Sequence, residues 1–289
     1  MSIENPQPST LNPAQRNGHL ASASDLAPLA FAGYAHFTAM QVRGGQVRGL
    51  DLHLARLRAA SQAMFDHALP HETILGHLSA ALPSEDADVS LTATVYSPAG
   101  EFTSAVDRHV PDVLVRVSAP SNGPVGPMRM ALVEHERMLP HLKHVGEIAK
   151  TYLLRQVVAR GFDDAVFLDR QGHISEGTIW NIVFWDGQAV VWPRARMLLG
   201  TAMSIVKRQL EAMGIPQRNM EIGIDSLPSL KGAAVMNSWT PCVAVHQLGT
   251  VPMPEAPEFH ALLHRAFCAE PLRSLQGDAK LLLPRSSLQ

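Results

Sequence analysis

The spacing of apolar residues divides most of the chain into short strands and helices. Apolar and polar residues alternate at 89–96, which predicts a strand with one buried face. Between 147 and 160 the apolar residues recur at roughly helical spacing, and Gly161 is well placed to end that helix. The pattern therefore predicts an α/β chain.

A strand pair and a helix open the patterned part of the chain. Residues 35–42 form the first predicted strand, and a glycine-rich turn at 43–45 leads into a second strand at 46–50. Asp51 is expected to cap the helix that follows, because its carboxylate can accept from the first free N–H groups. The other predicted segments are helices at 70–83 and 257–270, a helix opening near 201–203, and strands at 110–117, 128–133, 165–168, 183–185, 189–192 and within 232–246.

Proline, glycine and serine concentrate at 118–127, the clearest linker in the sequence. The first 26 residues lack periodicity and are rich in Pro, Asn and Ser, which predicts a flexible arm. The predicted divisions are a flexible arm at 1–26, a small α/β domain at 27–119, an interdomain linker at 120–127, a large domain at 128–270 and a tail at 271–289.

Composition narrows the class of protein. The 289 residues suffice for a sizeable core, and a net charge of -2 with a pI near 6.7 gives no basic surface for nucleic acid. Cys242 and Cys268 are too few for a disulfide framework. No apolar run approaches the ~18 residues of a membrane span. We therefore expect a cytoplasmic protein that binds neither nucleic acid nor membrane.

Three histidines, His135, His141 and His144, raise the question of a zinc site. No carboxylate or thiolate at the usual spacing completes a ligand set, and Pro140 interrupts the helix that such a site would need. The sequence therefore predicts no metal. An unrelated metal-binding α/β protein is kept as an alternative.

Lys143 is a candidate for covalent chemistry. A lysine amine condenses with an aldehyde only when it is neutral, and the apolar neighbours Leu142 and Val145 favour the lowered pKa that this requires. Few residues compete for the role, because the chain has only these lysines: Lys143, Lys150, Lys207, Lys231 and Lys280.

The order of features after Lys143 resembles the signature of the fold-type IV pyridoxal-phosphate (PLP) enzymes, the class IV aminotransferases. Gly161 follows about eighteen residues on, then a strand, a D-x-x-G turn and the run S-E-G-T-I-W-N at 175–181. The resemblance implies a two-domain α/β (α+β) fold, with a small N-terminal domain and a larger C-terminal domain that holds a barrel-like sheet. It also implies a homodimer, with PLP bound between the two domains.

The resemblance assigns roles to residues of this run. Lys143 would form the internal aldimine and later move a proton, and Glu176 would keep the ring nitrogen of the cofactor protonated so that the ring acts as an electron sink. Asn181 would contact the cofactor. Lys150 is the rival lysine, but it is expected in the middle of the predicted helix and lies too close to Gly161 for the family spacing.

Three further segments resemble the family's phosphate contacts. The motif H-x-x-R-L supplies Arg56, whose guanidinium suits a phosphate because it can donate two parallel hydrogen bonds. Gly200 and Thr201 open a helix whose N–H groups can bind an anion, although Ala202 replaces the threonine that is usual in the family. Ser238 is a candidate contact in a second loop. Capping of the helix by Thr201 is an equal alternative.

The predicted substrate pocket draws on both halves of the chain, and its candidate residues are Phe37, Thr38, Tyr96, Trp239 and Thr240. Thr38 is also a catalytic candidate, because the segment F-T-A-M-Q-V at 37–42 resembles the F-T-T-A-R-V of aminodeoxychorismate lyases. A lyase would use Thr38 near the cofactor to help eliminate pyruvate.

The resemblance implies transfer of an amino group between a small-molecule amino donor and a 2-oxo acid acceptor. Transamination ranks first because it needs only the lysine, the electron sink and a pocket that accepts an amine and then a keto acid. A 4-amino-4-deoxychorismate lyase, which releases pyruvate and 4-aminobenzoate, ranks second. A relative that binds the cofactor without catalysis is the third alternative.

Overall fold

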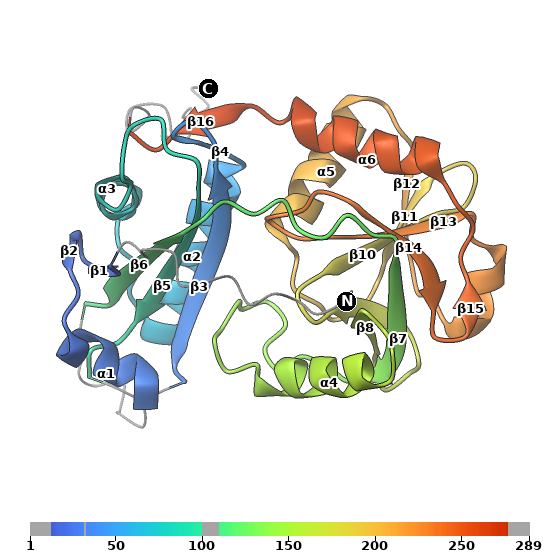
Figure 1. Ribbon diagram of the computed structural model, residues 1–289, viewed down its shortest axis with the longest axis horizontal. Coiled ribbons are helices and arrows are strands. Elements are labelled where there is room, and N and C mark those ends of the chain that lie inside the picture. The colour runs from blue at the N-terminus through green and yellow to red at the C-terminus, as the bar shows by residue number, and fades with distance from the viewer. Residues whose placement is uncertain (1–12, 32, 100–109, 277–289) are drawn as a thin grey trace, which may run out of the picture. The chain divides into compact units, whose positions relative to one another are not determined.

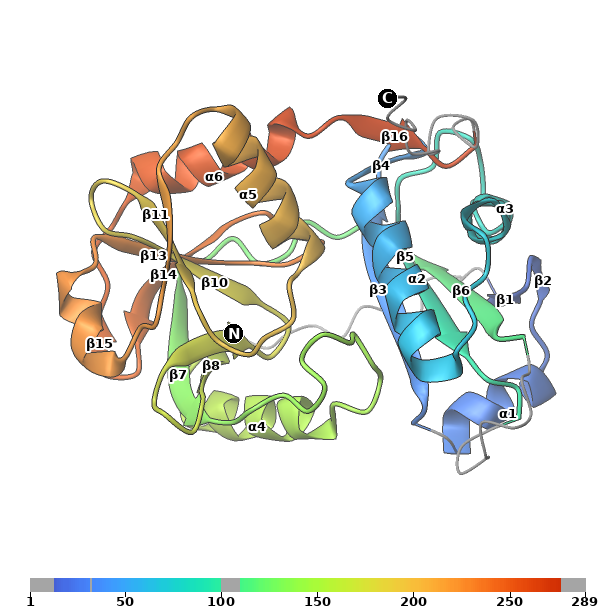
Figure 2. The same cartoon turned by 180° about the vertical axis from the view of Figure 1, so that it is seen from behind.

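The computed structural model describes residues 13–31, 33–99 and 110–276. The described chain forms two compact units, each with its own sheet (Figure 1 and, from behind, Figure 2). The division between Ser121 and Asn122 falls inside the stretch predicted to be a linker.

Neither unit is a single continuous stretch of chain. Unit 1 contains the described residues up to Ser121 together with His144–Gly146 and the residues from Leu272 onward. Unit 2 contains Asn122–Lys143 and Glu147–Pro271.

Unit 1 is built on a five-stranded antiparallel sheet in the order β2-β1-β6-β5-β3. Helix α2 lies along β3, as Figure 2 shows, and α3 contacts β6. The strands are β1 (Gln15–Arg16), β2 (His19–Leu20), β3 (Ala35–Val42), β4 (Gln46–Arg48), β5 (Val89–Tyr96), β6 (Asp112–Ser118) and β16 (Leu272–Ser274), and the helices are α1 (Ala23–Phe31), α2 (Leu50–Phe65) and α3 (His71–Ala80).

The helix that follows the first hairpin, α2, buries apolar side chains in the core of unit 1. Leu54 and Leu57 of α2 are buried in one cluster with Leu91 and Val95 of β5. Removing each such side chain from water contributes about 1.5–3 kcal/mol. The helix itself begins differently from the prediction. Its N-cap is Gly49, in the left-handed conformation, so Asp51 lies in the first turn rather than at the cap.

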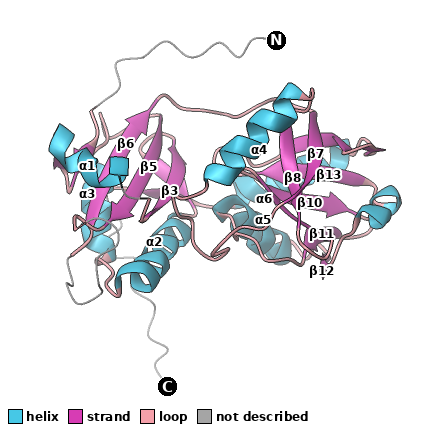
Figure 3. Cartoon of the chain, turned by 90° about the horizontal axis from the view of Figure 1, so that it is seen from below, coloured by secondary structure: helices cyan, strands magenta, loops and turns pink. Residues whose placement is uncertain are grey.

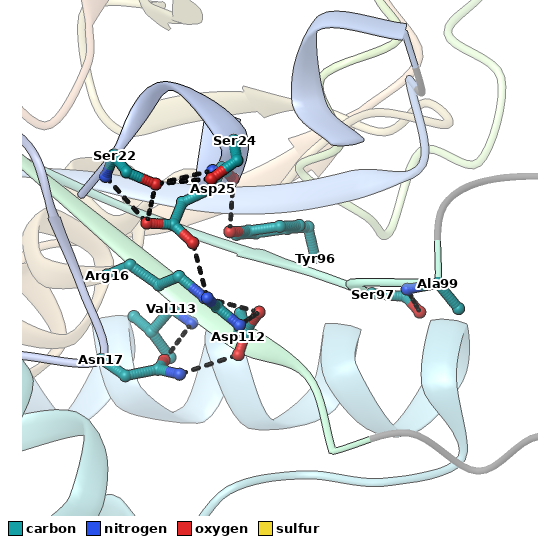
Figure 4. Close-up of polar contacts among 10 residues, drawn as sticks. All are labelled: Arg16, Asn17, Ser22, Ser24, Asp25, Tyr96, Ser97, Ala99, Asp112 and Val113. Carbon is teal, nitrogen blue, oxygen red and sulfur yellow. Dashed lines mark hydrogen bonds and ion pairs between the residues drawn. The ribbon is translucent and has the colours of Figure 1, made fainter. Parts of the chain in front are cut away.

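The prediction of an unstructured arm is wrong for residues 13–26. Arg16 of β1 forms ion pairs with Asp25 at 2.6 Å and with Asp112 at 2.8 Å, and Asn17 donates to Asp112 at 2.7 Å. Figure 4 shows these contacts side by side. Ion pairs between neighbouring segments therefore attach β1 and α1 to the edge of the sheet, which apolar periodicity could not reveal. Residues 1–12 of the predicted arm lie outside the described chain.

The predicted tail also contributes to unit 1. Leu272–Ser274 pairs with β4 in antiparallel register, and Leu275 is buried in the core of this unit. The described part of the tail, up to residue 276, is therefore structural.

Unit 2 contains a closed barrel of six strands, as the resemblance implied (Figure 3). The ring runs β9-β10-β13-β14-β7-β8 and closes because β8 and β10 both pair with β9. Closure removes the free edges that an open sheet would expose. Its strands are β7 (Met128–Glu134), β8 (Asp164–Leu168), β9 (Ile174–Gly177), β10 (Asn181–Trp185), β13 (Gly232–Met236) and β14 (Val243–Leu248).

Three further strands, three α-helices and one 3-10 helix complete unit 2. Helix α4 packs against β8, and α5 packs against α6 over a second apolar cluster. The elements are β11 (Val190–Pro193), β12 (Gln217–Met220), β15 (Val251–Pro252), α4 (Ile148–Ala159), α5 (Thr201–Ala212), α6 (Pro257–Ala269) and a 3-10 helix, η1 (Ile224–Ser229). Strand β12 is not predicted from the apolar pattern, because Q-R-N-M at 217–220 is largely polar, and the strand is mostly exposed.

None of the helices in the described residues combines the length and the hydropathy needed to cross a bilayer.

Candidate active site

Glu176 lies on β9, where the barrel closes. Its backbone pairs with Asn181 at the start of β10. Its side chain is only 6% exposed. A carboxylate with so little contact with water requires nearby cations or hydrogen-bond donors.

Two cations meet that requirement. Lys150 Nζ lies 3.2 Å from Glu176 Oε1, and Arg137 Nη1 lies 3.8 Å from the same oxygen. Arg137 Nε also lies 3.5 Å from Glu147 Oε1. The four side chains form an alternating row of two carboxylates and two cations, Glu147, Arg137, Glu176 and Lys150, which we call the ionic row. Its formal charges cancel.

Burial governs the electrostatics of the ionic row. It lowers the pKa of Lys150, whose side chain is 8% exposed, and the charge of Glu176 partly opposes this effect. Burial also lowers the pKa of His135, and the positive charge of Lys150 adds to that shift. The Lys150 ammonium therefore depends on Glu176, and the nearby imidazole favours its neutral form.

A second buried carboxylate fixes the turn between β9 and β10. Asp164 accepts hydrogen bonds from Thr178 Oγ1 at 2.6 Å and from Trp180 Nε1 at 2.8 Å. Burial raises the pKa of Asp164, and these hydrogen bonds oppose the rise. These hydrogen bonds hold the T-I-W segment at 178–180 in place. This segment is the turn that connects Glu176 to Asn181, so the turn helps to position both residues.

Asn181 connects the barrel to the N-terminus of α5. Its side-chain amide donates to Leu198 O at 2.8 Å and its carbonyl accepts from Gly200 N at 3.0 Å. A Cβ atom added at Gly200 would lie 2.1 Å from Asn181 Oδ1. The close approach explains why glycine stands at the N-cap of α5.

The next residue, Thr201, is buried, and among the described residues its hydroxyl Oγ1 has no hydrogen-bond partner. It lies in the first turn of α5, where backbone N–H groups point out of the helix and the helix dipole favours an anion. Ala202, which follows, is also buried. An oxyanion would satisfy both the hydroxyl and the free N–H groups.

The loop after β13 leaves the barrel at the same end, because Met236 pairs with Asn181. Ser238 is half-buried in this loop and Trp239 is 39% exposed. Thr240 is predicted to line the substrate pocket, but its surroundings are different. It is buried, and its hydroxyl donates to Asn122 O at 3.4 Å. Its contact is therefore with the linker.

The two candidate lysines have distinct surroundings. Lys143 is half-buried and is the last residue of unit 2 before the chain enters unit 1, where His144 pairs with His36 of β3. Lys150 is the lysine beside Glu176. Because α4 begins at Ile148, Lys150 lies in the first turn of the helix, and the view of it as a mid-helix residue is wrong.

The remaining predicted site residues, Arg56, Phe37, Thr38 and Tyr96, belong to unit 1. Arg56 is on α2 and half-buried. Phe37 is half-buried on β3, and strand alternation turns it to the face opposite to Thr38. These two side chains therefore cannot line one surface.

Thr38 and Tyr96 have structural contacts in place of the predicted ligand contacts. Thr38 is 0% exposed and shares a hydrogen bond of 2.6 Å with His53 Nδ1 of α2. Tyr96 is 2% exposed and donates its hydroxyl to Asp25 O at 2.9 Å (Figure 4). Neither side chain offers a surface to a ligand within unit 1.

Sequence reasoning missed Arg137, Glu147 and Asp164. No short motif marks them, since their roles depend on the way that α4 and β8 pack beside β9. Charged residues next to predicted buried strands were the available signal. In the described residues, no three histidine, cysteine or acidic side chains are grouped so as to hold a metal ion.

Comparison with known proteins identifies the family of this chain. Residues 35–248 match the sequence profile of the family described as amino-transferase class IV. The chain belongs to the class IV aminotransferases. Enzymes of this family depend on PLP. A search of curated proteins found no match.

Solved structures of two aminotransferases and of a candidate lyase share the fold of this chain. A branched-chain aminotransferase from Thermoproteus uzoniensis, with norvaline, superposes with a TM-score of 0.76 at 17% identity, covering 89% of this chain and 93% of the other. The PLP-bound form of a hypothetical aminotransferase from Mycobacterium tuberculosis gives 0.69 at 19% identity, covering 88% and 98%. A candidate 4-amino-4-deoxychorismate lyase from Legionella pneumophila gives 0.72 at 18% identity, covering 84% and 93%.

The residues of unit 2 fit PLP, the cofactor of the family. The cofactor carries a phosphate, and the buried Thr201 hydroxyl beside the N-terminus of α5 lacks a partner that a phosphate oxygen would supply. Its ring nitrogen can carry a proton. Glu176 Oε1 is a buried carboxylate oxygen 3.2 Å from the Lys150 ammonium, and because such an oxygen has two lone pairs it can also accept from an N–H donor.

The contact between Gly200 and Asn181 generates a prediction. Gly200→Ala should destabilise the cofactor-free protein by about 1–3 kcal/mol, because the new methyl group collides with the Asn181 amide. Urea unfolding measures the loss. Gly76→Ala is the matched control: no atom lies within 4 Å of the new Cβ, and an alanine within helix α3 should be neutral or stabilising. Equal stability of the two variants would show that Asn181 moves aside.

Proposed function

We propose that this class IV enzyme is an aminotransferase that moves an amino group from an amino acid or amine to a 2-oxo acid. The observation that carries the proposal is Glu176, a buried carboxylate at the closure of the barrel whose oxygens have the lone pairs to accept from a ring N–H donor as well as from Lys150. PLP, when bound, supplies an electron sink and a carbon that accepts the amino group. The protein residues bind it, orient it and move protons.

Glu176 has the properties required to hold a proton on the ring nitrogen. Hydrogen bonds position Trp180 and Asn181, and so hold the turn that follows the strand of Glu176. A buried carboxylate interacts strongly with a nearby cationic N–H group, because little water screens the charge. Removal of that carboxylate would weaken the electron sink.

Lys143 is proposed as the lysine that joins the cofactor and transfers the proton at the substrate carbon. The family spacing to Gly161 and Glu176 supports this assignment. Geometry supports it as well. The aldehyde carbon and the nitrogen of the cofactor stand at opposite ends of the ring, so the joined lysine is kept at a ring's width from Glu176. Lys150, already in ion-pair contact with Glu176, is poorly suited to that position.

Four residues are proposed to bind the phosphate. In unit 2, Gly200 and Thr201 would contribute backbone N–H groups and the buried hydroxyl, with Ser238 from the second loop. The Arg56 guanidinium would contribute from unit 1. Asn181 would act indirectly, because it fixes the position of Gly200. Phe37 and Trp239 are the proposed contacts for the substrate.

The burial of Thr38 favours transamination over the lyase. The lyase interpretation needed the Thr38 hydroxyl near the cofactor, yet this hydroxyl is fully buried and bonded to His53. Transamination does not require it. An aminodeoxychorismate lyase nevertheless stays the second candidate, because the F-T-A-M-Q-V segment resembles the lyase sequence.

The reaction is tested by single half-reactions. We offer the PLP-loaded protein a panel of amino acids and amines without any acceptor, and follow its absorbance as the cofactor converts to pyridoxamine phosphate. Conversion by at least one common amino acid is expected of an aminotransferase. No conversion, together with release of 4-aminobenzoate and pyruvate from aminodeoxychorismate, would establish the lyase instead.

The lysine assignment is tested by substitution. Lys143→Ala should abolish the yellow colour of the bound cofactor and its capture by borohydride, because no amine then joins the cofactor. Lys150→Ala should retain both. Mass spectrometry of the reduced peptides identifies the modified residue. The reverse pattern would transfer the role to Lys150.

We further propose, from the family resemblance, that two copies of the chain assemble as a homodimer. Sedimentation velocity should therefore detect a two-chain species as the main component at micromolar concentration. A fully active monomer would contradict this.

A further inference from the structure

We propose that Lys150 is a positioning residue for Glu176, and that its ammonium group weakens the hold of Glu176 on the ring-nitrogen proton. The inference rests on the proposed function, since it assumes that Glu176 contacts the cofactor ring. It adds a residue that tunes the strength of the electron sink.

Within the described part of the chain, Lys150 has one close anionic contact. Its Nζ lies 3.2 Å from Glu176 Oε1, and the face of the Phe167 ring lies 5.6 Å from the same nitrogen. Because the ammonium is buried beside an aromatic face and one carboxylate, water screens its charge only weakly. Lys150 and Glu176 therefore fix the orientation of one another.

The charge of Lys150 acts on the same oxygen that would face the ring. A carboxylate stabilises a neighbouring N–H cation through its negative charge, and a second cation at ion-pair distance opposes that stabilisation. Arg137, at 3.8 Å, acts in the same direction but shares its charge with Glu147. Lys150 is therefore the cation with the larger expected effect.

The titratable groups around Lys150 come from every element packed against it. Glu147 precedes it at the start of α4, Asp164 lies on β8, Glu176 lies on β9, and the segment that follows β7 carries His135 and Arg137. Each of these groups interacts electrostatically with the Lys150 ammonium. Any measured pH dependence must accordingly be compared between variants rather than assigned to Lys150 alone.

The alternative role for Lys150, that of joining the cofactor, predicts different chemistry. Such a lysine would have to leave Glu176, so that the ring could lie between the two side chains. Its removal would then abolish covalent capture of the cofactor, whereas removal of a positioning lysine would not. The two roles are separated by one experiment.

The test uses the full chain loaded with PLP that is isotopically labelled at the ring nitrogen. The NMR chemical shift of that nitrogen reports whether it carries a proton, and is followed against pH. In Lys150→Met and Lys150→Gln the proton should persist to a pH higher by about one unit or more. Lys150→Arg, which keeps the charge, should restore the wild-type midpoint.

Lys231→Met is the matched control, because Lys231 is an exposed lysine of unit 2 outside the ionic row. Its midpoint should equal that of the wild-type protein. Borohydride reduction and peptide mapping are performed on every variant, and should find the cofactor on Lys143 throughout. Thermal unfolding identifies which variants remain folded, and the neutral glutamine variant preserves the test where methionine does not fold.

Two outcomes would overturn the inference. The first is an unchanged midpoint in a folded, cofactor-bound Lys150→Met or Lys150→Gln protein. The second is capture of the cofactor on Lys150 itself. Failure of PLP binding, on which the proposed function rests, looks different, because no lysine would then be captured and no labelled nitrogen signal from bound cofactor would be seen. Failure of transamination alone is detected separately by the half-reactions with amino acids.

Discussion

The site depends on the need to bury the charge of Glu176. A carboxylate that is almost withdrawn from water is stable only beside cations, and Lys150 and Arg137 provide them from α4 and from the segment after β7. This requirement links three parts of the chain that are distant in sequence. It also couples the start of α4 to the closure of the barrel, because movement of either element would leave a buried charge without its partner.

The closed barrel places Glu176 next to the other residues of the candidate site. Glu176 and Asn181 are paired across β9 and β10, so one register positions both of them. From Asn181 two hydrogen bonds reach the residues before α5, which directs the end of this helix and its free N–H groups to a fixed place. A carboxylate for a ring nitrogen and an anion site for a phosphate thus share one rigid support.

Much of this arrangement could be predicted from sequence, and its failures have physical causes. The strands of the barrel and the Glu176 to Asn181 run follow from apolar pattern and motif, because both are local. The environment of Lys150 could not be predicted, since it is set by packing between α4 and β9. The sequence predicts no structure for residues 13–26, because polar contacts such as Arg16 with Asp112 leave no apolar period. Strand alternation alone could have warned that Phe37 and Thr38 face opposite sides.

The pairing of β16 with β4 bears on how the protein can be divided for study. A fragment that stops at the linker would carry β4 without its partner strand and would lack Leu275 from its core. An unpaired strand edge invites association with other chains. Unit 1 therefore needs a strand that is synthesised after all of unit 2. During translation, unit 1 cannot complete its folding before unit 2 has been made. Tags and fusions at the C-terminus lie close in sequence to a strand that this unit needs.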